Sequence, residues 1–165
     1  MLRPPSLPSR VQDLPEQSAP VIAPLTVDDL PQLMALQAEL INEVGDLDRM
    51  RELFARICKD SNYSLLGAKK QGHLVGSLAG IVCHDLFGKC LPFMVIENVI
   101  VTSALRHQGI GRKLMMEVER IARTRGCRYL MLVSSITREQ APAFYHSLGY
   151  ESAPYRGFKK TLVPW

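Results

Sequence analysis

The sequence predicts an α/β protein in which helices flank a sheet of mixed, mostly antiparallel strand direction. Two observations carry this prediction. Apolar residues recur at helical spacing up to about residue 57, and from residue 63 they gather into short runs typical of strands. A nearly continuous apolar run then extends from Phe93 to Thr102, stops at a turn with two glycines and is followed by a helical pattern. The expected order of elements is β-α-α-β-β-β-α-β-α-β-β.

The chain has two predicted parts. Residues 1–20 contain five prolines among polar residues and show no apolar period, so burial cannot offset the entropy of ordering them. We expect a flexible Pro-rich tail there; the alternative is a segment that covers the sheet edge or a partner subunit. Residues 21–165 form one predicted domain, beginning with a short strand at 21–23, because a chain of 165 residues is long enough for one core.

Two amphipathic helices are expected after this first strand. Thr26 offers an N-cap hydroxyl, and Asp29 stands at the third helical position, as in a capping box. Gly45 should end the first helix, and Asp46 or Asp48 should start the second. Both helices gather their apolar residues on one face, which predicts that they pack against the sheet.

A hairpin is expected next. Residues 63–70 and 73–84 read as two strands that the Gln71-Gly72 turn joins. Gly76 and Gly80 lie inside the second strand, where a glycine indicates a bulge or a close approach of another backbone.

The second half of the chain continues the alternation of strands and helices. A helix is predicted from about Gly111 to Arg125, because its apolar stripe has helical spacing and Gly126 suits the position after a helix. The remaining expected elements are a buried strand at Tyr129–Val133, a short helix at Ala141–Leu148 that Gly149 ends, and two last strands within Tyr150–Val163.

Composition narrows the class of protein. Lys and Arg number 20 against 16 Asp and Glu, and the basic residues are scattered except between residues 106 and 128; this argues against nucleic-acid binding. No apolar run reaches the ~20 residues that span a membrane, and the N-terminus lacks the apolar region of a secretory signal. We therefore expect a cytoplasmic protein that binds neither nucleic acid nor membrane.

The four cysteines predict no metal site. They form no CxxC pair and have no histidine at ligand spacing. An even number of cysteines leaves disulfides open, but free buried thiols in a reducing compartment are the favoured interpretation. The histidines are interpreted as surface or strand-end residues, apart from His107, which lies in the glycine turn.

That turn, Arg106-His107-Gln108-Gly109-Ile110-Gly111, is the most informative segment. A strand ends, glycines let the chain turn, and the N-H groups at the start of the next helix face a ligand with the positive end of the helix dipole. This arrangement suits a phosphate or pyrophosphate. The dinucleotide fingerprint and the P-loop do not fit, because Leu114 replaces a third glycine and no GK-Ser/Thr follows. A turn without a ligand is the alternative at this point.

Two sequence blocks resemble the GCN5-related N-acetyltransferase (GNAT) family. One is R-x-x-G-x-G after a strand that ends V-x-V; the other, Ala141 to Tyr150, is similar to the A-x-x-FY-x-x-LG[FY] segment of that family. The resemblance extends from Val21 to Val163 and implies a mixed sheet with a splayed central strand, and acetyl-CoA as co-substrate without a metal.

The resemblance also implies where acetyl-CoA binds. Its pantetheine arm would pair with the backbone of Val99, Ile100 and Val101, with a backbone N-H near Val99 polarising the acetyl carbonyl. Its pyrophosphate would lie on the turn, from Arg106, His107, Gln108, Gly109, Ile110 and Gly111 to Arg112. Arg138 stands where many relatives carry a cofactor-binding Asn; it is long enough to reach a phosphate or a carbonyl.

Two further residues are candidates for proton transfer. Glu97 stands alone in an apolar strand, and similar relatives carry a glutamate there as the base that takes a proton from the amine. The alternative is a structural Glu97 paired with an arginine or a helix N-terminus. Tyr145 aligns with the family tyrosine that hydrogen-bonds or protonates the leaving thiolate; the alternative is a core tyrosine beside Phe144.

The acceptor stays open at this stage. The regions expected to select it contain acidic residues that suit a cationic amine and basic residues that suit a phosphorylated amino sugar. These residues are Glu39, Glu43, Asp46, Asp48, Asp85 and Glu151 on one side and Arg49, Arg51, Arg56, Lys89 and Arg156 on the other. A small-molecule amine is the favoured partner; a lysine or N-terminal amine of a protein, or a non-catalytic acyl-CoA sensor, are the alternatives. A homodimer is left open.

Overall fold

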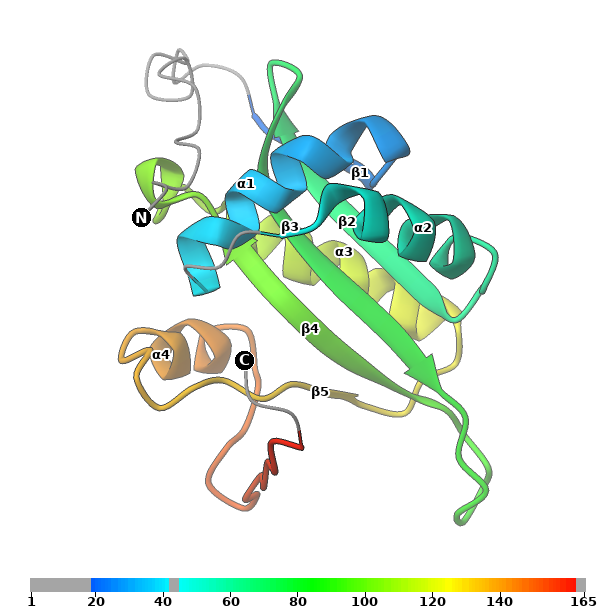
Figure 1. Ribbon diagram of the computed structural model, residues 1–165. Helices are drawn as coiled ribbons and strands as arrows, with labels where there is room; N and C mark the ends of the chain where they lie inside the picture. The colour runs from blue at the N-terminus through cyan, green and yellow to red at the C-terminus, as the bar shows by residue number, and fades with distance from the viewer. Residues whose placement is uncertain (1–18, 42–44, 163–165) are drawn as a thin grey trace. The chain divides into compact units, whose positions relative to one another are not determined.

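Five strands form one sheet in the computed structural model, which describes residues 19–41 and 45–162 (Figure 1). Their spatial order follows the sequence, and all neighbours are antiparallel except the last pair, which is parallel. The strands are β1 (Val21–Pro24), β2 (Tyr63–Lys70), β3 (His73–Cys83), β4 (Phe93–Val101) and β5 (Leu130–Met131). The predicted mixed, mostly antiparallel sheet is therefore confirmed.

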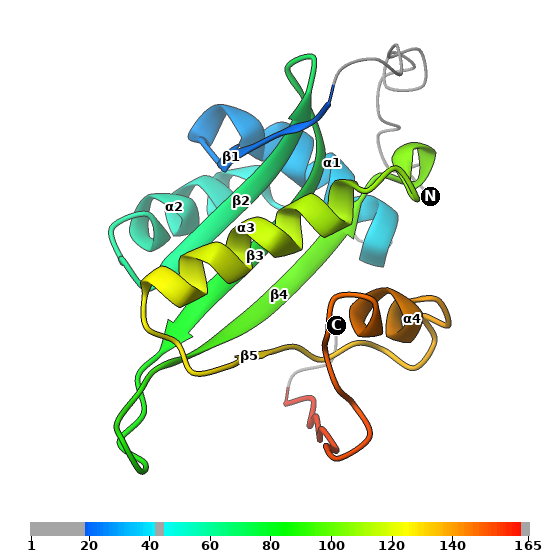
Figure 2. The same cartoon turned by 180° about the vertical axis from the view of Figure 1, so that it is seen from behind.

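Helices cover both faces of this sheet. The turn η2 (Val27–Asp29) leads into α1 (Leu30–Ile41), and α2 (Leu47–Ile57) lies beside α1 on the same face, as Figure 1 shows. The longest helix, α3 (Ile110–Thr124), crosses the opposite face (Figure 2). Between β4 and α3 runs the short turn η3 (Ser103–Leu105).

The chain divides into two compact units after Met131. The first contains the sheet with α1, α2 and α3, and the second contains α4 (Ala141–His146) and the segment after it. Within the described residues, no helix combines the length and the apolar character that a membrane span requires. Residues 1–18 and 42–44, on which the predicted tail and Glu43 fall, lie outside the described part.

The core on the α1 side contains leucines that helical spacing places on one face of α1. They pack with one residue each from β3 and β4, and Leu47, Met50, Phe54 and Leu65 cover the edge of the cluster. The buried members are Leu25, Leu30, Leu33, Leu36, Leu74 and Ile100. Since each buried leucine contributes about 1.5–3 kcal/mol by leaving water, this cluster stabilises the attachment of α1 to the sheet.

On the other face, α3 approaches β3 closely. A Cβ atom added at Gly80 would lie 2.7 Å from Cγ2 of Val118 and 3.0 Å from the sulfur of Met94, and one at Gly76 would lie 3.2 Å from Cδ1 of Leu114. Real Cβ atoms do not tolerate the first distance. The two glycines therefore allow the helix to pack against the strand. The predicted close approach of another backbone is found at Gly76, where the added Cβ would lie 3.0 Å from the carbonyl oxygen of Ile100.

Several local predictions are also confirmed. The hairpin turn places both Gln71 (φ 50°) and Gly72 (φ 80°) in the left-handed region, as a tight two-residue turn requires. Asp46 caps α2 through hydrogen bonds from two backbone N-H groups. Gly126 (φ 70°) and Gly149 (φ 85°) follow α3 and α4 in the left-handed conformation that ends helices.

Three predictions need correction. The strand expected at Tyr129–Val133 covers only Leu130–Met131, and Tyr150–Leu162 contains no strand in the part that is described. A strand requires a partner for its peptide groups, and the large apolar side chains of this segment, among them Tyr155 and Phe158, are exposed. The four cysteines are free, but they are not buried as predicted. Cys58 and Cys90 are exposed, and Cys83 and Cys127 are partly exposed.

The predicted capping box contributes an ion pair to the fold. The Asp29 carboxylate accepts hydrogen bonds from the N-H (2.8 Å) and the hydroxyl (2.9 Å) of Thr26, and it contacts the ammonium group of Lys69 at 2.8 Å. Burial raises the pKa of Asp29, but the bonds from Lys69 and Thr26 outweigh burial and hold the pKa below its usual value. The charged form is therefore the one that the fold stabilises.

We predict that Asp29→Asn lowers the free energy of unfolding by about 1.5–3 kcal/mol at neutral pH, since it removes charge-assisted hydrogen bonds. Because the folded pKa lies below the unfolded value, this contribution is full above about pH 4 and is lost as the pH falls through the folded pKa. Urea unfolding at pH 7 and at pH 3 measures it. Asp28→Asn, at the exposed neighbour, is the control; equal losses for both variants at pH 7 would contradict the assignment.

Candidate functional site

Strand β4 leaves its neighbour β5 after a short contact. The two strands pair only at Met94 with Leu130 and at Val95 with Met131, whereas β3 follows β4 as far as Val101. From Ile96 onward, one edge of β4 thus has no strand partner among the described residues. This is the splayed central strand that the resemblance predicts.

The peptide groups of Val99 and Val101 face this open edge. The N-H of Thr102 donates to the carbonyl of Val75 on β3, and peptide groups alternate between the two edges of a strand. The peptide groups of Val101 and Val99 therefore point away from β3. In agreement, the carbonyl of Val101 accepts a hydrogen bond from Nε of Arg106 (3.3 Å). An extended ligand chain can pair with this edge as an added strand does.

A β-bulge interrupts β4 in front of these residues. Ser77 pairs with Ile100 and Ala79 with Glu97, so Asn98 and Val99 together oppose the single residue Leu78. Asn98 has φ 55°, a left-handed conformation that asparagine tolerates better than most residues. The bulge bends the strand and re-aims the side chains that follow it.

The bulge reverses which face of the sheet the side chains after it reach, relative to the side chains before it. Met94 lies under α3, and strict alternation would place Ile100 there too. Instead, Ile100 packs in the core on the α1 side. Glu97, one residue before the bulge, has the opposite parity from Met94 and faces the α1 side, where its side chain is exposed. It has no ion-pair partner among the described residues, so the structural alternative for Glu97 gains no support.

The predicted phosphate turn connects β4 to α3. His107 (φ 62°) and Gly109 (φ 77°) both adopt left-handed conformations, which fold the chain back so that α3 begins at Ile110. No side chain caps this helix end by a hydrogen bond. The first N-H groups of α3 therefore keep the capacity to bind an anion.

Side chains around the turn add to this site. Arg106, His107, Gln108 and Gly109 are exposed, and Gly111 is partly buried; Ile110 is buried and anchors the turn in the core. Arg112 is exposed and has an interaction partner within the protein. The structure therefore brings the predicted cofactor residues 99–101 and 106–112 together as one continuous strand, turn and helix start.

Tyr145 and Arg138 lie in the second unit. Tyr145 is on α4, with its ring edge-on to Phe144 (5.1 Å between centroids) and to Tyr150 (5.9 Å). Burial raises the pKa of Tyr145, and the positive charge of Arg138 lowers it by less. The phenol is therefore fully protonated at neutral pH and can donate a proton or a hydrogen bond. Arg138 is exposed in the turn before α4.

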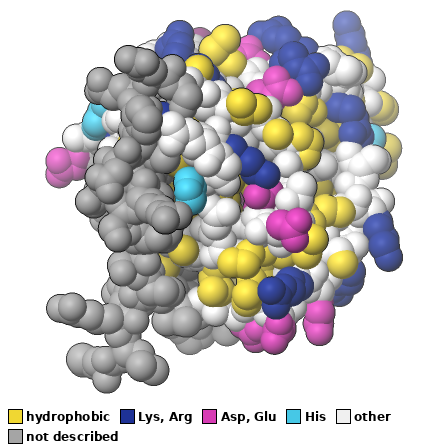
Figure 3. Space-filling model, turned by 90° about the horizontal axis from the view of Figure 1, so that it is seen from above, with side chains coloured by type: hydrophobic (Ala, Val, Ile, Leu, Met, Phe, Trp, Pro, Cys, Tyr) yellow, Lys and Arg dark blue, Asp and Glu magenta, His cyan; other side chains and the backbone are white. Residues whose placement is uncertain are grey.

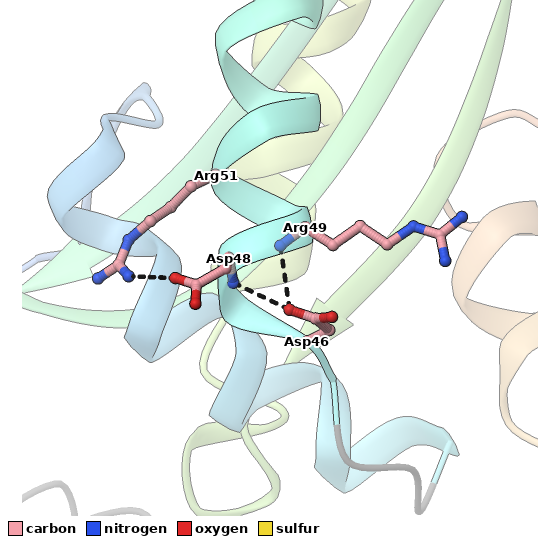
Figure 4. Close-up of polar contacts among 4 residues, drawn as sticks. All are labelled: Asp46, Asp48, Arg49 and Arg51. Atoms are coloured by element: carbon pink, nitrogen blue, oxygen red, sulfur yellow. Dashed lines mark hydrogen bonds and ion pairs between the residues drawn. The ribbon is translucent and has the colours of Figure 1, made fainter.

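The acidic side chains near the start of α2 are already occupied. Figure 4 shows Asp46 accepting hydrogen bonds from the N-H groups of Asp48 and Arg49, and the carboxylate of Asp48 contacting the guanidinium of Arg51 at 3.0 Å. The side chain of Arg49 extends away from these carboxylates in the same view, and its guanidinium has no partner in the described part of the chain.

Acidic and basic side chains are both present on the coloured part of the face that Figure 3 presents. Within residues 19–41 and 45–162, no cluster of three or more His, Cys, Asp or Glu side chains could hold a metal ion.

Comparison with known families identifies the fold. The model of the Acetyltransferase (GNAT) family matches residues 30–150, which include the splayed strand, the turn and α4. The chain belongs to the GNAT family. It is therefore an N-acetyltransferase, and the family implies acetyl-CoA as the donor of the acetyl group.

Individual relatives differ in what they act on. Aminoalkylphosphonate N-acetyltransferase of Salmonella typhimurium is 30% identical over 139 residues, covering 83% of this chain and 88% of its own. N-alpha-acetyltransferase 80 of Mus musculus is 32% identical over 136 residues, covering 79% of this chain and 42% of its own. A crystal structure of a transcriptional regulator from Bacillus halodurans superposes with a TM-score of 0.80 at 28% identity, over 87% of this chain and 99% of that one.

Two features of the site were not predicted from the sequence. Asn98 is the bulge residue, and the only signal for it was an asparagine inside an apolar strand. Glu39 was placed among the residues that attract a cationic amine, but its carboxylate is bound to Thr102 and Ser103 at the end of β4. No short motif marks such a contact, because the partners are 63 and 64 residues apart.

We predict that Asn98→Val lowers the free energy of unfolding by about 1–3 kcal/mol, because a β-branched residue is strained at φ 55°, and that it reduces acetyl transfer by disturbing the bulge. Asn98→Gly, which adopts the same φ without strain, should keep both properties near those of the native protein. Urea unfolding and a thioester assay test the pair. A fully active and stable valine variant would show that the bulge needs no left-handed residue.

Proposed function

We propose that the protein transfers an acetyl group from acetyl-CoA to the primary amine of a small molecule by direct attack within a ternary complex. The observation that carries this proposal is the continuous path from the open edge of β4, at Val99–Val101, to the N-terminus of α3, which lacks a side-chain cap. It offers peptide groups to an amide-rich pantetheine arm and N-H groups to a pyrophosphate.

The amine must lose a proton before it attacks, because an ammonium group has no lone pair and a free alkylamine has a pKa of ~10.4. Glu97 is the proposed acceptor of that proton, directly or through a water molecule. It is exposed on the sheet face that α1 and α2 cover in part, and it is held one residue before the bulge. The amine nitrogen then attacks the carbonyl carbon of the thioester.

The remaining steps stabilise charge on oxygen and then on sulfur. A backbone N-H near Val99 is the proposed donor to the carbonyl oxygen while that oxygen is negative. When the C-S bond breaks, the thiolate of coenzyme A takes a proton, for which Tyr145 is the proposed source; the proton that the positively charged nitrogen of the adduct loses, carried by solvent, restores the phenol and leaves a neutral amide. The raised pKa of this phenol keeps the proton in place over the neutral range.

For the acceptor, we infer a small amine that also carries an anionic group such as a phosphonate or a phosphate. The acidic residues Asp46 and Asp48 are engaged in a cap and an ion pair, and Glu39 is bound to the end of β4. Arg49 extends from the same helix layer, and its guanidinium has no partner among residues 19–41 and 45–162. Guanidinium groups bind such anions with two hydrogen bonds. The name of the Salmonella relative agrees with an acceptor of this kind.

Glu97→Gln should lower turnover at pH 7 by about 10²-fold or more, the usual contribution of a general base. Activity should recover in part as the pH rises toward the pKa of the amine, because the free amine needs no base. A pH-rate profile of both proteins measures this. If the glutamine variant loses the same factor at every pH, Glu97 does not accept the proton.

Arg49→Ala should raise the KM for an aminoalkylphosphonate by about tenfold, the loss expected for one charge-assisted contact. The KM for an alkylamine of the same length without the phosphonate should stay unchanged. Arg51→Ala is the matched control, since Arg51 is already paired with Asp48. An equal effect of Arg49→Ala on both acceptors would remove Arg49 from anion recognition.

The same acceptor panel separates the alternatives. Acetylation of a peptide N-terminus or of a lysine in preference to every small amine would assign the protein to the class that the name of the mouse relative describes. Binding of acetyl-CoA without turnover on any amine would indicate a sensor. No thermal stabilisation by acetyl-CoA would reject the proposed function itself.

A further inference from the structure

One carboxylate joins α1 to the end of β4. Oε1 of Glu39 accepts a hydrogen bond from the hydroxyl of Thr102 (2.9 Å), and Oε2 accepts one from the N-H of Ser103 (2.9 Å). Both oxygens of the side chain are thus used, on two consecutive residues. Glu39 lies in the last turn of α1 as it is described, so the contact connects the helix layer to the strand that carries the candidate site.

Thr102 is the point where β4 becomes the phosphate turn. Its side chain is buried (2% exposed), its N-H donates to the carbonyl of Val75 on β3 (2.9 Å), and its carbonyl accepts from the N-H of Leu105 in η3 (3.1 Å). Its hydroxyl is bound to Glu39. Residues of β3, η3 and α1 therefore all bind Thr102. Of these, Glu39 is the one that also binds the next residue, Ser103.

The contact with Ser103 fixes the direction of η3. Ser103 is the first residue of η3, and the N-H groups at the start of a helical turn have no partner within the turn itself. Glu39 supplies that partner from another part of the chain. From here, residues 103–109 lead to the N-terminus of α3, so a rotation at Ser103 would displace the whole turn relative to Val99 and Val101.

We propose that Glu39 is a positioning residue for the coenzyme. Its carboxylate holds the exit of β4 so that the open peptide edge and the N-terminus of α3 bind the pantetheine arm and the pyrophosphate of one acetyl-CoA molecule at the same time. A ligand that spans two sites binds tightly only when their separation is fixed in advance. The inference rests on the proposed function of that path, and it assigns to Glu39 a role in donor affinity.

A purely structural contact would behave differently. It would contribute to stability and leave the affinity of the folded protein for acetyl-CoA unchanged. The positioning role predicts a selective effect: the Kd and KM for acetyl-CoA rise, while kcat at saturating donor and the KM for the amine stay within about twofold.

The test compares acetyl-CoA binding by isothermal titration calorimetry in Glu39→Gln, Thr102→Val and Thr102→Ser. The glutamine keeps the shape of Glu39 but offers only one acceptor oxygen to two donors, and valine removes the hydroxyl of Thr102 at similar volume. Both should raise the Kd about tenfold, the effect of losing a charge-assisted hydrogen bond. Thr102→Ser keeps the hydroxyl and should retain the native Kd. Steady-state kinetics with an aminoalkylphosphonate as acceptor supply the KM and kcat values.

Glu52→Gln, at an exposed glutamate of α2, is the matched control and should bind acetyl-CoA as the native protein does. A native Kd in Glu39→Gln and Thr102→Val, with only a lower melting temperature, would overturn the inference. An equal rise in the KM for donor and acceptor, or failure of Thr102→Ser to restore binding, would overturn it as well. If the native protein itself does not bind acetyl-CoA, the proposed function fails first and the inference fails with it.

Discussion

The bulge at Asn98 and Val99 is the constraint on which the rest of the structure depends. Before it, Met94 packs under α3; after it, Ile100 packs in the core on the α1 side. Because of the one inserted residue, Met94 and Ile100 pack into different cores, whereas regular alternation would place them on the same face. The same distortion lies where β4 has left β5. The peptide groups of Val99 and the N-H of Val101 therefore have no strand partner among the described residues, while the carbonyl of Val101 accepts from Arg106. The fold accepts an unpaired strand edge because both faces of that strand are anchored.

Glu97 stands one residue before this bulge. In a regular strand of apolar residues, a charged side chain would be costly to bury. Here it precedes the bulge and points to the face on which α1 and α2 lie, without a partner of opposite charge in the described part of the chain. Glu39, which belongs to α1, has the opposite character: both oxygens are bound to the backbone and side chain at the exit of β4. Two glutamates near one strand thus differ in their hydrogen bonds, and we propose different tasks for them.

Much of this was predictable from the sequence because it depends on local rules. The hairpin at Gln71-Gly72, the helix cap at Asp46 and the left-handed Gly109 each follow from the conformations that single residues prefer. The contacts of Glu39 could not be predicted, since its partners are more than 60 residues away and no local sequence pattern indicates them. The two strands expected within Tyr150–Val163 are absent from the described residues for a related reason: pairing with another strand, which a local pattern does not reveal, decides whether a strand forms.

The central claim is that one acetyl-CoA molecule binds along the open edge of β4 and the start of α3. Amide hydrogen exchange, measured with and without saturating acetyl-CoA, tests it most directly because it reports on individual peptide groups. We expect slower exchange at Val99, Val101, Ile110 and Gly111, and little change at Val82, which pairs with Met94 at the opposite end of the β3-β4 pairing from Val101. Saturable binding that leaves the four amides unprotected would contradict it.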